Sequence, residues 1–279
     1  MGWMKDETGL DKCAANYVPL TPLSGLNRAL EVFPDHLAVA HGPHRKTYRE
    51  YHDRVTRLAS ALAAMGVQPG DVVSTLLPNI PAAAEAHFGV PACGAVLNSI
   101  NIRLDVHTVA YILDHGEAKV MLVDTEFLSL AEAACETMEG TAPTIIEVAD
   151  PAHGHPATGR HTEYETLLAG ADATFAWILP EDEWESIALN YTSGTTVHPK
   201  GVVYHHRGAY LNAMGQVLSW RMVLHPVYLT IVPLFHCNGW CHTWMMPMVG
   251  GTIVCCRDIT AKAIFDAIAD EKATHFGGA

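Results

Sequence analysis

The chain is short of positive charge. It has 17 lysines and arginines against 30 aspartates and glutamates in 279 residues, so its formal net charge at pH 7 is −13. Surfaces that bind nucleic acids are normally basic, and this balance argues against a nucleic-acid partner. Charged residues make up only 17% of the chain, while 49% are hydrophobic. That composition is typical of a folded globular protein and excludes a disordered chain.

The sequence also lacks the marks of a secreted or membrane protein. Its seven cysteines have no framework spacing, which favours reduced thiols in the cytosol. Because residues 1–12 carry several charges, we expect no signal peptide there. Residues 231–251 carry no formal charge, but prolines, glycines and histidines make them a poor membrane span. We therefore expect a cytoplasmic protein without a membrane span.

The most informative segment is Tyr191-Thr-Ser-Gly-Thr-Thr-Val-His-Pro-Lys200-Gly201. Small residues fill positions 192–196, and apolar runs on both sides predict flanking strands. Backbone N–H groups and hydroxyls can surround phosphate oxygens, and Lys200 adds a point charge. A polar hairpin loop is the alternative, but it gives no reason for a lysine behind Pro199. The segment is not a Walker A loop, because a proline replaces the second glycine and no hydroxyl follows the lysine.

This segment resembles the phosphate loop of the adenylate-forming superfamily, which includes acyl-CoA synthetases, luciferases and peptide-synthetase adenylation domains. The family form is Tyr-Thr-Ser-Gly-Thr-Thr-Gly-x-Pro-Lys-Gly, and the one departure is Val197 in place of glycine. A β-branched residue tolerates positive φ poorly, so Val197→Gly should tighten ATP binding if Val197 impairs the loop. The resemblance implies that the loop holds the β- and γ-phosphates of ATP. The residues it assigns to this role are Thr192, Ser193, Gly194, Thr195, Thr196 and Lys200.

A second resemblance covers Val232-Pro-Leu-Phe-His-Cys-Asn-Gly-Trp240. Acyl-CoA synthetases have an aromatic–histidine pair in such a segment, near the acyl and thioester-forming site. The resemblance implies that His236 is catalytic. It also implies a substrate pocket formed by His236, Asn238, Gly239 and Trp240. Taken alone, a histidine in an apolar segment is more often a satisfied core residue.

Histidines and cysteines near this segment raise a zinc alternative. The residues concerned are His236, Cys237, Cys241, His242, Cys255 and Cys256. Adjacent side chains of a strand face opposite ways, so Cys255 and Cys256 cannot both reach one ion. The Mg²⁺ of the implied reaction relies mainly on phosphate oxygens and water. No metal-binding side chains are therefore predicted.

Helical and strand-like patterns alternate along the chain. Amphipathic spacing predicts a helix over 51–65, Pro81 can open a second helix, and Asp105 can cap a third. Strand-like runs cover 72–77, 119–123, 144–148, 228–232 and 252–255. This alternation is typical of α/β layering around parallel sheets.

The resemblance extends over essentially the whole chain. It implies that 1–279 is a truncated large N-terminal domain of an AMP-forming ligase, built from layered parallel-sheet subdomains. Residues 1–180 would form the first subdomain with a crossing segment, and 181–279 the part of the second that carries the phosphate loop. We expect the C-terminal lid domain of the family, with its catalytic lysine, to be missing from this chain. We therefore expect a fragment that forms no acyl-adenylate alone.

The implied reaction has two steps. A small carboxylic acid attacks the α-phosphate of Mg-ATP to give acyl-adenylate and pyrophosphate, and the thiol of coenzyme A then displaces AMP. Likeness to acid–CoA ligases in residues 11–23 and 94–98 favours a medium-chain fatty or aromatic acid. The alternatives are an adenylation domain that loads a carrier protein and a non-catalytic nucleotide-binding or scaffold module. The sequence does not decide whether the protein forms a homodimer.

Overall fold

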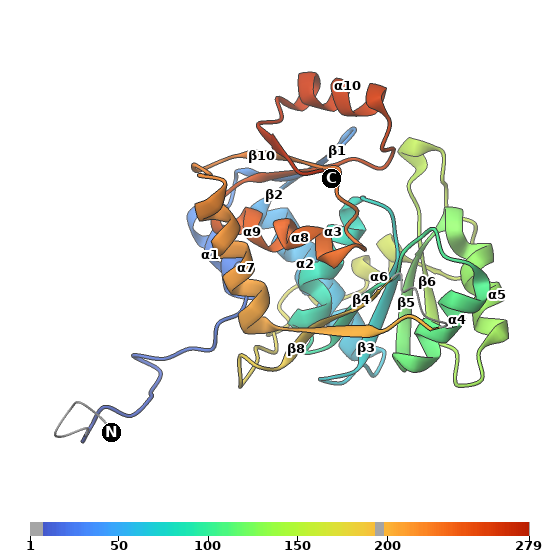
Figure 1. Cartoon of the computed structure of the whole chain (residues 1–279), viewed down its shortest axis with the longest axis horizontal. Coiled ribbons are helices and arrows are strands. Elements are labelled where there is room, and N and C mark those ends of the chain that lie inside the picture. Colours follow the sequence, from blue (N-terminus) through green and yellow to red (C-terminus); the bar gives the residue numbers. More distant parts are fainter. Residues whose placement is uncertain (1–7, 193–197, 279) are drawn as a thin grey trace.

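The computed structural model describes residues 8–192 and 198–278, which fold around two β-sheets (Figure 1). The larger sheet has seven strands in the order β7-β6-β5-β3-β4-β8-β9. These strands are β3 (Val72–Leu76), β4 (Val96–Ser99), β5 (Ala118–Asp124), β6 (Thr144–Val148), β7 (Thr162–Glu163), β8 (Ser186–Tyr191) and β9 (Gly201–His205). All neighbours pair in parallel except β8 and β9. The carboxyl ends of β4 and β8 therefore lie side by side.

The smaller sheet has five strands in the order β12-β10-β11-β1-β2. They are β1 (Leu37–His41), β2 (His44–Thr47), β10 (Val227–Thr230), β11 (Thr252–Cys255) and β12 (His275–Phe276). Strand β1 pairs in parallel with β11 and antiparallel with β2. A hairpin near the start of the chain therefore shares a sheet with the last strands of the described chain.

Helices form layers on and between the sheets (Figure 1). They are α1 (Leu23–Val32), α2 (Tyr48–Ala64), α3 (Pro81–Ala92), α4 (Val106–His115), α5 (Leu128–Thr137), α6 (Tyr164–Ala169), α7 (His206–Ser219), α8 (Cys237–Trp240), α9 (His242–Met248) and α10 (Ala261–Glu271), with 3₁₀ turns at Thr125–Phe127 and Pro151–His153. Helices α2, α3 and α9 share one apolar core with strands of both sheets. Helices α4 and α5 cover the other face of the larger sheet, and α10 covers the outer face of the smaller one.

Local sequence explains the central helices. Thr47 and Glu50 form a reciprocal capping box at the start of α2, and Pro81 occupies the first turn of α3. Every residue of α3 from 82 to 92 is buried, and its alanines let it fit between two sheets. A Cβ on Gly89 would stand only 2.6 Å from Leu58 of α2. Small side chains thus set the close approach of α2 and α3.

Much of the uncharged stretch 231–251 is buried, although His236 and Trp240 are exposed. The stretch forms α8 and α9, and Trp244, Met245 and Met246 are fully buried. Over the ranges that the structure describes, no helix is long and apolar enough to cross a membrane.

The predicted α/β class with parallel sheets is confirmed. The helices expected at 51–65, Pro81 and Asp105 are present, as are the strands expected at 72–77 and 144–148. The division expected at residue 180 does not follow the sheets. Strands β1 and β2, from the first part of the chain, share the smaller sheet with β10, β11 and β12. Strands β8 and β9, from the second part, complete the larger sheet. The subdomain boundary near residue 180 stays a prediction.

Candidate active site

A cavity of about 450 Å³ opens at the carboxyl ends of β4 and β8. Open α/β sheets bind ligands at such an edge. The cavity is bounded by the ends of both strands, by α4, by β9 and by the segment that leads into α8. Its polar lining includes Asn101, Asn190, Thr192, Tyr204 and His236. No carboxylate, lysine or arginine is among the described lining residues.

The candidate phosphate loop is closed at its base by two hydrogen bonds. The Thr192 N–H donates to the carbonyl of Lys200 over 3.0 Å, and the Lys200 N–H donates to Oγ1 of Thr192 over 3.3 Å. The neighbouring Tyr191 hydroxyl lies 2.7 Å from Nδ1 of His115. Burial, and secondarily Tyr111, raises the pKa of Tyr191 to about 12. Other loop residues of the prediction, Ser193, Gly194, Thr195 and Thr196, lie outside the described residues, as does Val197.

The segment after His236 is one turn of left-handed helix. The φ angles of Cys237, Asn238, Gly239, Trp240 and Cys241 are 50°, 51°, 56°, 55° and 63°. Glycine adopts this backbone freely and asparagine does so more readily than most residues, whereas for other residue types it costs about 1–2 kcal/mol. Such strain persists only where the surroundings hold it, and it is concentrated at functional sites.

Two asparagines hold this turn and the strand that leads to it. The Asn238 side chain donates to Oδ1 of Asn190 over 2.8 Å. The Asn79 side chain donates to the carbonyl of Thr230 over 2.8 Å and accepts from the N–H of Leu234 over 2.9 Å. The turn is therefore fixed to the end of β8, and the segment before it is fixed to the start of α3.

The structure places one residue of the predicted substrate pocket at the cavity. His236 is exposed and lines it. The Asn238 side chain is buried and makes the hydrogen bond to Asn190 described above. Gly239 faces Leu234: a Cβ added to Gly239 would lie 2.7 Å from the Leu234 Cδ2. Trp240 is 36% exposed and does not line the cavity. The left-handed turn rotates these three residues away, and a catalytic role for His236 stays a prediction.

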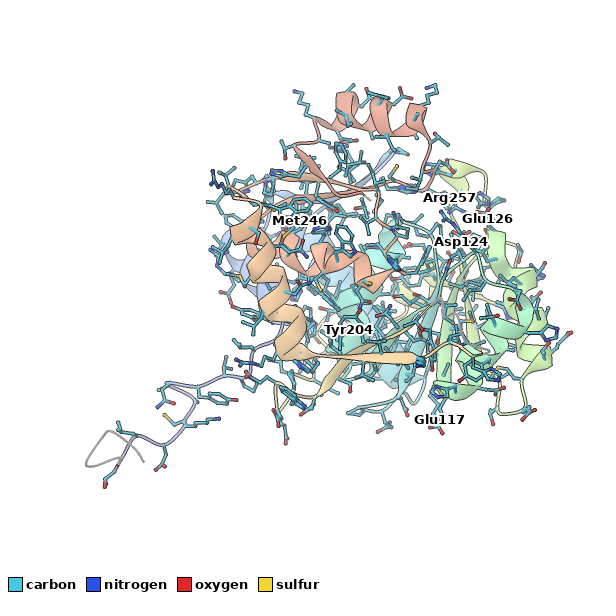
Figure 2. The ribbon with its side chains drawn as sticks, in the orientation of Figure 1. Glu117, Asp124, Glu126, Tyr204, Met246 and Arg257 are labelled. Carbon is cyan, nitrogen blue, oxygen red and sulfur yellow. The ribbon has the colours of Figure 1, made fainter. Side chains whose placement is uncertain are left out.

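Sequence reasoning missed other residues of the lining, notably Tyr204 and Cys237. Figure 2 shows Tyr204 on β9, where burial and then the thiol of Cys237 raise its pKa to about 12. A signal for Tyr204 exists in the sequence, because side chains alternate along a strand. Val202 and Tyr204 line the cavity, while Val203 between them is 60% exposed. Cys237 enters the cavity through the left-handed turn, which no local pattern predicts.

The residues of the zinc alternative do not converge in the part of the chain that the structure describes. None of His236, Cys237, Cys241, His242, Cys255 and Cys256 belongs to a group of three that could share an ion. Burial raises the pKa of the Cys241 thiol to about 11, which disfavours the thiolate that zinc requires. The prediction that the active site uses no protein-bound metal stays a prediction.

Comparison with known proteins adds the following findings. The sequence profile described as "AMP-binding enzyme" matches residues 26–279. The acetate/butyrate–CoA ligase AAE7, peroxisomal, of Arabidopsis thaliana is 48% identical over 283 residues, which cover 98% of this chain and 50% of that protein. The trans-cinnamate:CoA ligase, peroxisomal, of Petunia hybrida is 43% identical over 282 residues, which cover 95% of this chain and 49% of that protein.

Solved structures show the same fold. The inhibitor-bound N-terminal domain of FACL13 from Mycobacterium tuberculosis matches with a TM-score of 0.81 at 23% identity, over 93% of this chain and 63% of that one. The chain spans about half the length of the curated relatives that it matches.

Proposed function

The chain belongs to the AMP-binding enzyme family, and we propose that it carries the phosphate-binding loop and the carboxylate site of an AMP-forming acid–CoA ligase. One observation supports this proposal most: Thr192 at the base of the loop and His236 line the same cavity. A nucleotide phosphate at the loop and a carboxylate beside His236 would therefore meet inside one site.

Positioning and charge neutralisation carry most of the proposed chemistry. A carboxylate oxygen attacks the α-phosphorus of ATP, and pyrophosphate leaves with the electron pair of the broken P–O bond. The thiol of coenzyme A then attacks the acyl carbon and AMP leaves. Lys200 would offset phosphate charge, and His236 would donate a hydrogen bond to the activated carboxyl group. Fixed donors of this kind are effective because they need no reorganisation during reaction.

Magnesium fits this site only through its substrate. The described lining offers no carboxylate, and Mg²⁺ commonly keeps several waters and binds substrate phosphates. The ion would therefore be held mainly by the phosphate oxygens of ATP and by water.

For the substrate, we propose a small monocarboxylic acid. The sequence favours a medium-chain or aromatic acid, and the names of the two relatives add acetate, butyrate and cinnamate to the candidates. Apolar residues of the lining, among them Ile100, Leu104 and Ile112, suit a short apolar tail. The expected products are pyrophosphate, AMP and an acyl-CoA.

The test begins with the intact mass of the protein, which is compared with the length of its open reading frame. This comparison decides whether the 279-residue chain or a longer one is assayed. That chain is then assayed for ATP–pyrophosphate exchange and for acyl-CoA with acetate, butyrate, octanoate and cinnamate. Exchange together with a CoA thioester supports the proposal. Exchange without thioester would favour loading of a carrier protein, and absence of both from a chain of the relatives' full length would contradict the proposal. We expect the 279-residue chain alone to give no exchange.

Cytoplasmic location and homodimer formation also stay predictions. The two relatives above are named peroxisomal, so imaging of a fluorescent fusion should compare both compartments. Light scattering of the purified protein tests the dimer.

A further inference from the structure

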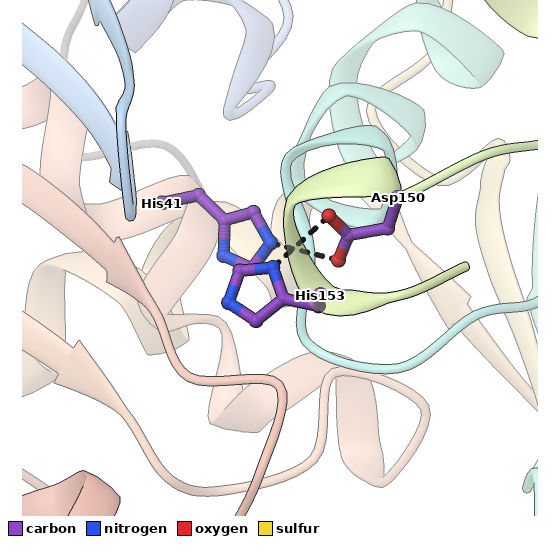
Figure 3. A group of neighbouring side chains, drawn as sticks. All are labelled: His41, Asp150 and His153. Atoms are coloured by element: carbon purple, nitrogen blue, oxygen red, sulfur yellow. Dashed lines mark hydrogen bonds and ion pairs between the residues drawn. The ribbon is translucent and has the colours of Figure 1, made fainter. Parts of the chain in front are cut away.

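A second group of chemically active side chains lies away from the candidate active site, at the junction of the two sheets. Figure 3 shows His41, Asp150 and His153 facing one another. His41 ends β1 of the smaller sheet, whereas Asp150 follows β6 of the larger one and His153 ends the 3₁₀ turn after it. The His41 Nε2 lies 2.9 Å from one Asp150 oxygen, and the His153 Nδ1 lies 3.0 Å from the other.

The donor atoms of this group also match a metal-ligand set. The two imidazole rings stack with centroids 4.2 Å apart, and each directs a nitrogen at the same carboxylate. Each of the three residues offers a ligand atom, and these atoms lie within 4.8 Å of one another. Two imidazoles and a carboxylate are a common donor set for zinc and related ions. Tetrahedral bonds of about 2.0 Å need ligand atoms roughly 3.3 Å apart, so only small movements are required.

The charged residues around the group also favour a bound cation. Arg257 donates to Asp124 over 2.7 Å, to Glu126 over 2.7 Å and to Asp150 over 3.2 Å, and Figure 2 shows it beside the first two. The Glu126 side chain is 45% exposed and so is screened by solvent. The buried carboxylates of Asp124 and Asp150 share the one guanidinium, which leaves one negative charge to be balanced. The side chains of Arg257, Asp124 and Asp150 are at most 5% exposed, and buried charges are costly when unbalanced. A cation bound among these side chains would balance the remaining charge.

The group also has an open side. His41 and Asp150 line a second cavity, of about 470 Å³, between the two sheets. Lys46 and Arg54 line the same cavity, as does Tyr164. Glu85, Glu163 and Glu165 line it too, and Arg54 is paired with Glu85 and Glu165, so the cavity does not favour an anion. A water molecule can enter it as the fourth ligand of an ion held by the three side chains.

We propose that His41, Asp150 and His153 bind one divalent transition-metal ion, with zinc as the best-suited member of this class. The ion joins β1 of the smaller sheet to the end of β6 in the larger sheet, and it presents an open coordination position to the cavity. It stabilises the contact between the sheets and takes no part in the proposed adenylation chemistry. The rival explanation is that protonated histidines supply the missing charge.

The test uses the purified chain after removal of metal with EDTA. Titration with Co²⁺, followed by its visible absorption, and with Zn²⁺, followed by calorimetry, should show one ion per chain. Saturating Zn²⁺ should raise the midpoint of thermal unfolding, because a ligand that binds only the folded state stabilises it.

Variants assign the site. His153→Ala should weaken Zn²⁺ binding more than tenfold and abolish the thermal shift. His161→Ala is the matched control, because its side chain is 26% exposed against 28% for His153 and it also pairs with a carboxylate, that of Glu132 in α5. Equal affinity in both variants would overturn the proposal, as would the absence of one-to-one binding in the unmodified chain. Asp124, Glu126 and His155 form a neighbouring group that could also hold an ion. If His155→Ala loses Zn²⁺ binding while His153→Ala keeps it, the ion sits in that group and the proposal is overturned.

Discussion

The side-chain amide of Asn238 donates a hydrogen bond to Oδ1 of Asn190 over 2.8 Å. Asn190 stands in β8 just before the candidate phosphate loop, and Asn238 stands in the left-handed turn that follows His236. The bond therefore joins the two segments that carry the proposed function.

A double-mutant cycle on this pair should show coupling. Asn190→Ala removes the acceptor, and Asn238→Gly removes the donor while it keeps a residue that tolerates positive φ. We expect a coupling free energy of about 1 kcal/mol in urea unfolding, as is usual for a neutral hydrogen bond. Strictly additive effects of the two changes would show that the bond does not contribute to stability.

Gly239→Ala should destabilise the protein by about 1–3 kcal/mol. The residue has φ of 56°, and an added Cβ would stand 2.7 Å from Cδ2 of Leu234. Gly215→Ala is the control, because no atom lies within 4 Å of its added Cβ. Inside helix α7 that change should be neutral or stabilise by about 0.5–1 kcal/mol. If both variants unfold at the same urea concentration, the left-handed turn is not strained as described.

Arg257→Met should cost about 3 kcal/mol or more in the free energy of unfolding. The change leaves the buried carboxylates of Asp124 and Asp150 without their guanidinium. Arg49→Met removes an exposed pair with Asp35, whose side chains are 62% and 82% exposed, and should cost less than about 0.5 kcal/mol. Chemical unfolding of both variants measures the difference, and similar small losses would refute the argument from burial.

Stability should fall as the pH drops from about 6.5 towards 4. Burial lowers the pKa of His87, His206 and His242 to about 4 each from the ordinary 6.5. The unfolded chain then binds more protons than the folded one in this window, so acid favours unfolding there. His87→Met should reduce the loss of stability between pH 7 and pH 5 by up to roughly 2 kcal/mol. Urea titrations at the two pH values check this, and an unchanged loss in the variant would count against it.

The sequence predicted those elements whose signals are local. Pro81 and Asp105 mark helix starts through their own chemistry, and the hydrophobic period sets the helix at 51–65. Strands β8 and β9 follow from the apolar runs on either side of the small residues. Partners distant in the chain were not predictable in this way. Nothing near β1 in the sequence indicates that it pairs with β11.

In the candidate site, too, some residues follow from local sequence and others depend on tertiary contacts. Thr192, Lys200 and His236 lie in motifs, so a resemblance identifies them and the structure groups Thr192 and His236 at one cavity. The left-handed turn is different, because Cys237, Trp240 and Cys241 do not favour positive φ. Its conformation depends on tertiary bonds from Asn190, and no residue pattern in the turn shows that it moves Trp240 away from the cavity.

The most direct test of the account is the affinity of the 279-residue chain for Mg-ATP, measured by calorimetry. Loss of a charge-assisted phosphate contact costs about 1.5–3 kcal/mol, so Lys200→Ala should bind at least tenfold more weakly than the unmodified chain. Lys262→Ala, on α10 with an 86% exposed side chain, should bind as tightly as the unmodified chain. Equal affinity of the two variants, or no binding by the unmodified chain, would contradict the claim that this loop holds the phosphates of ATP.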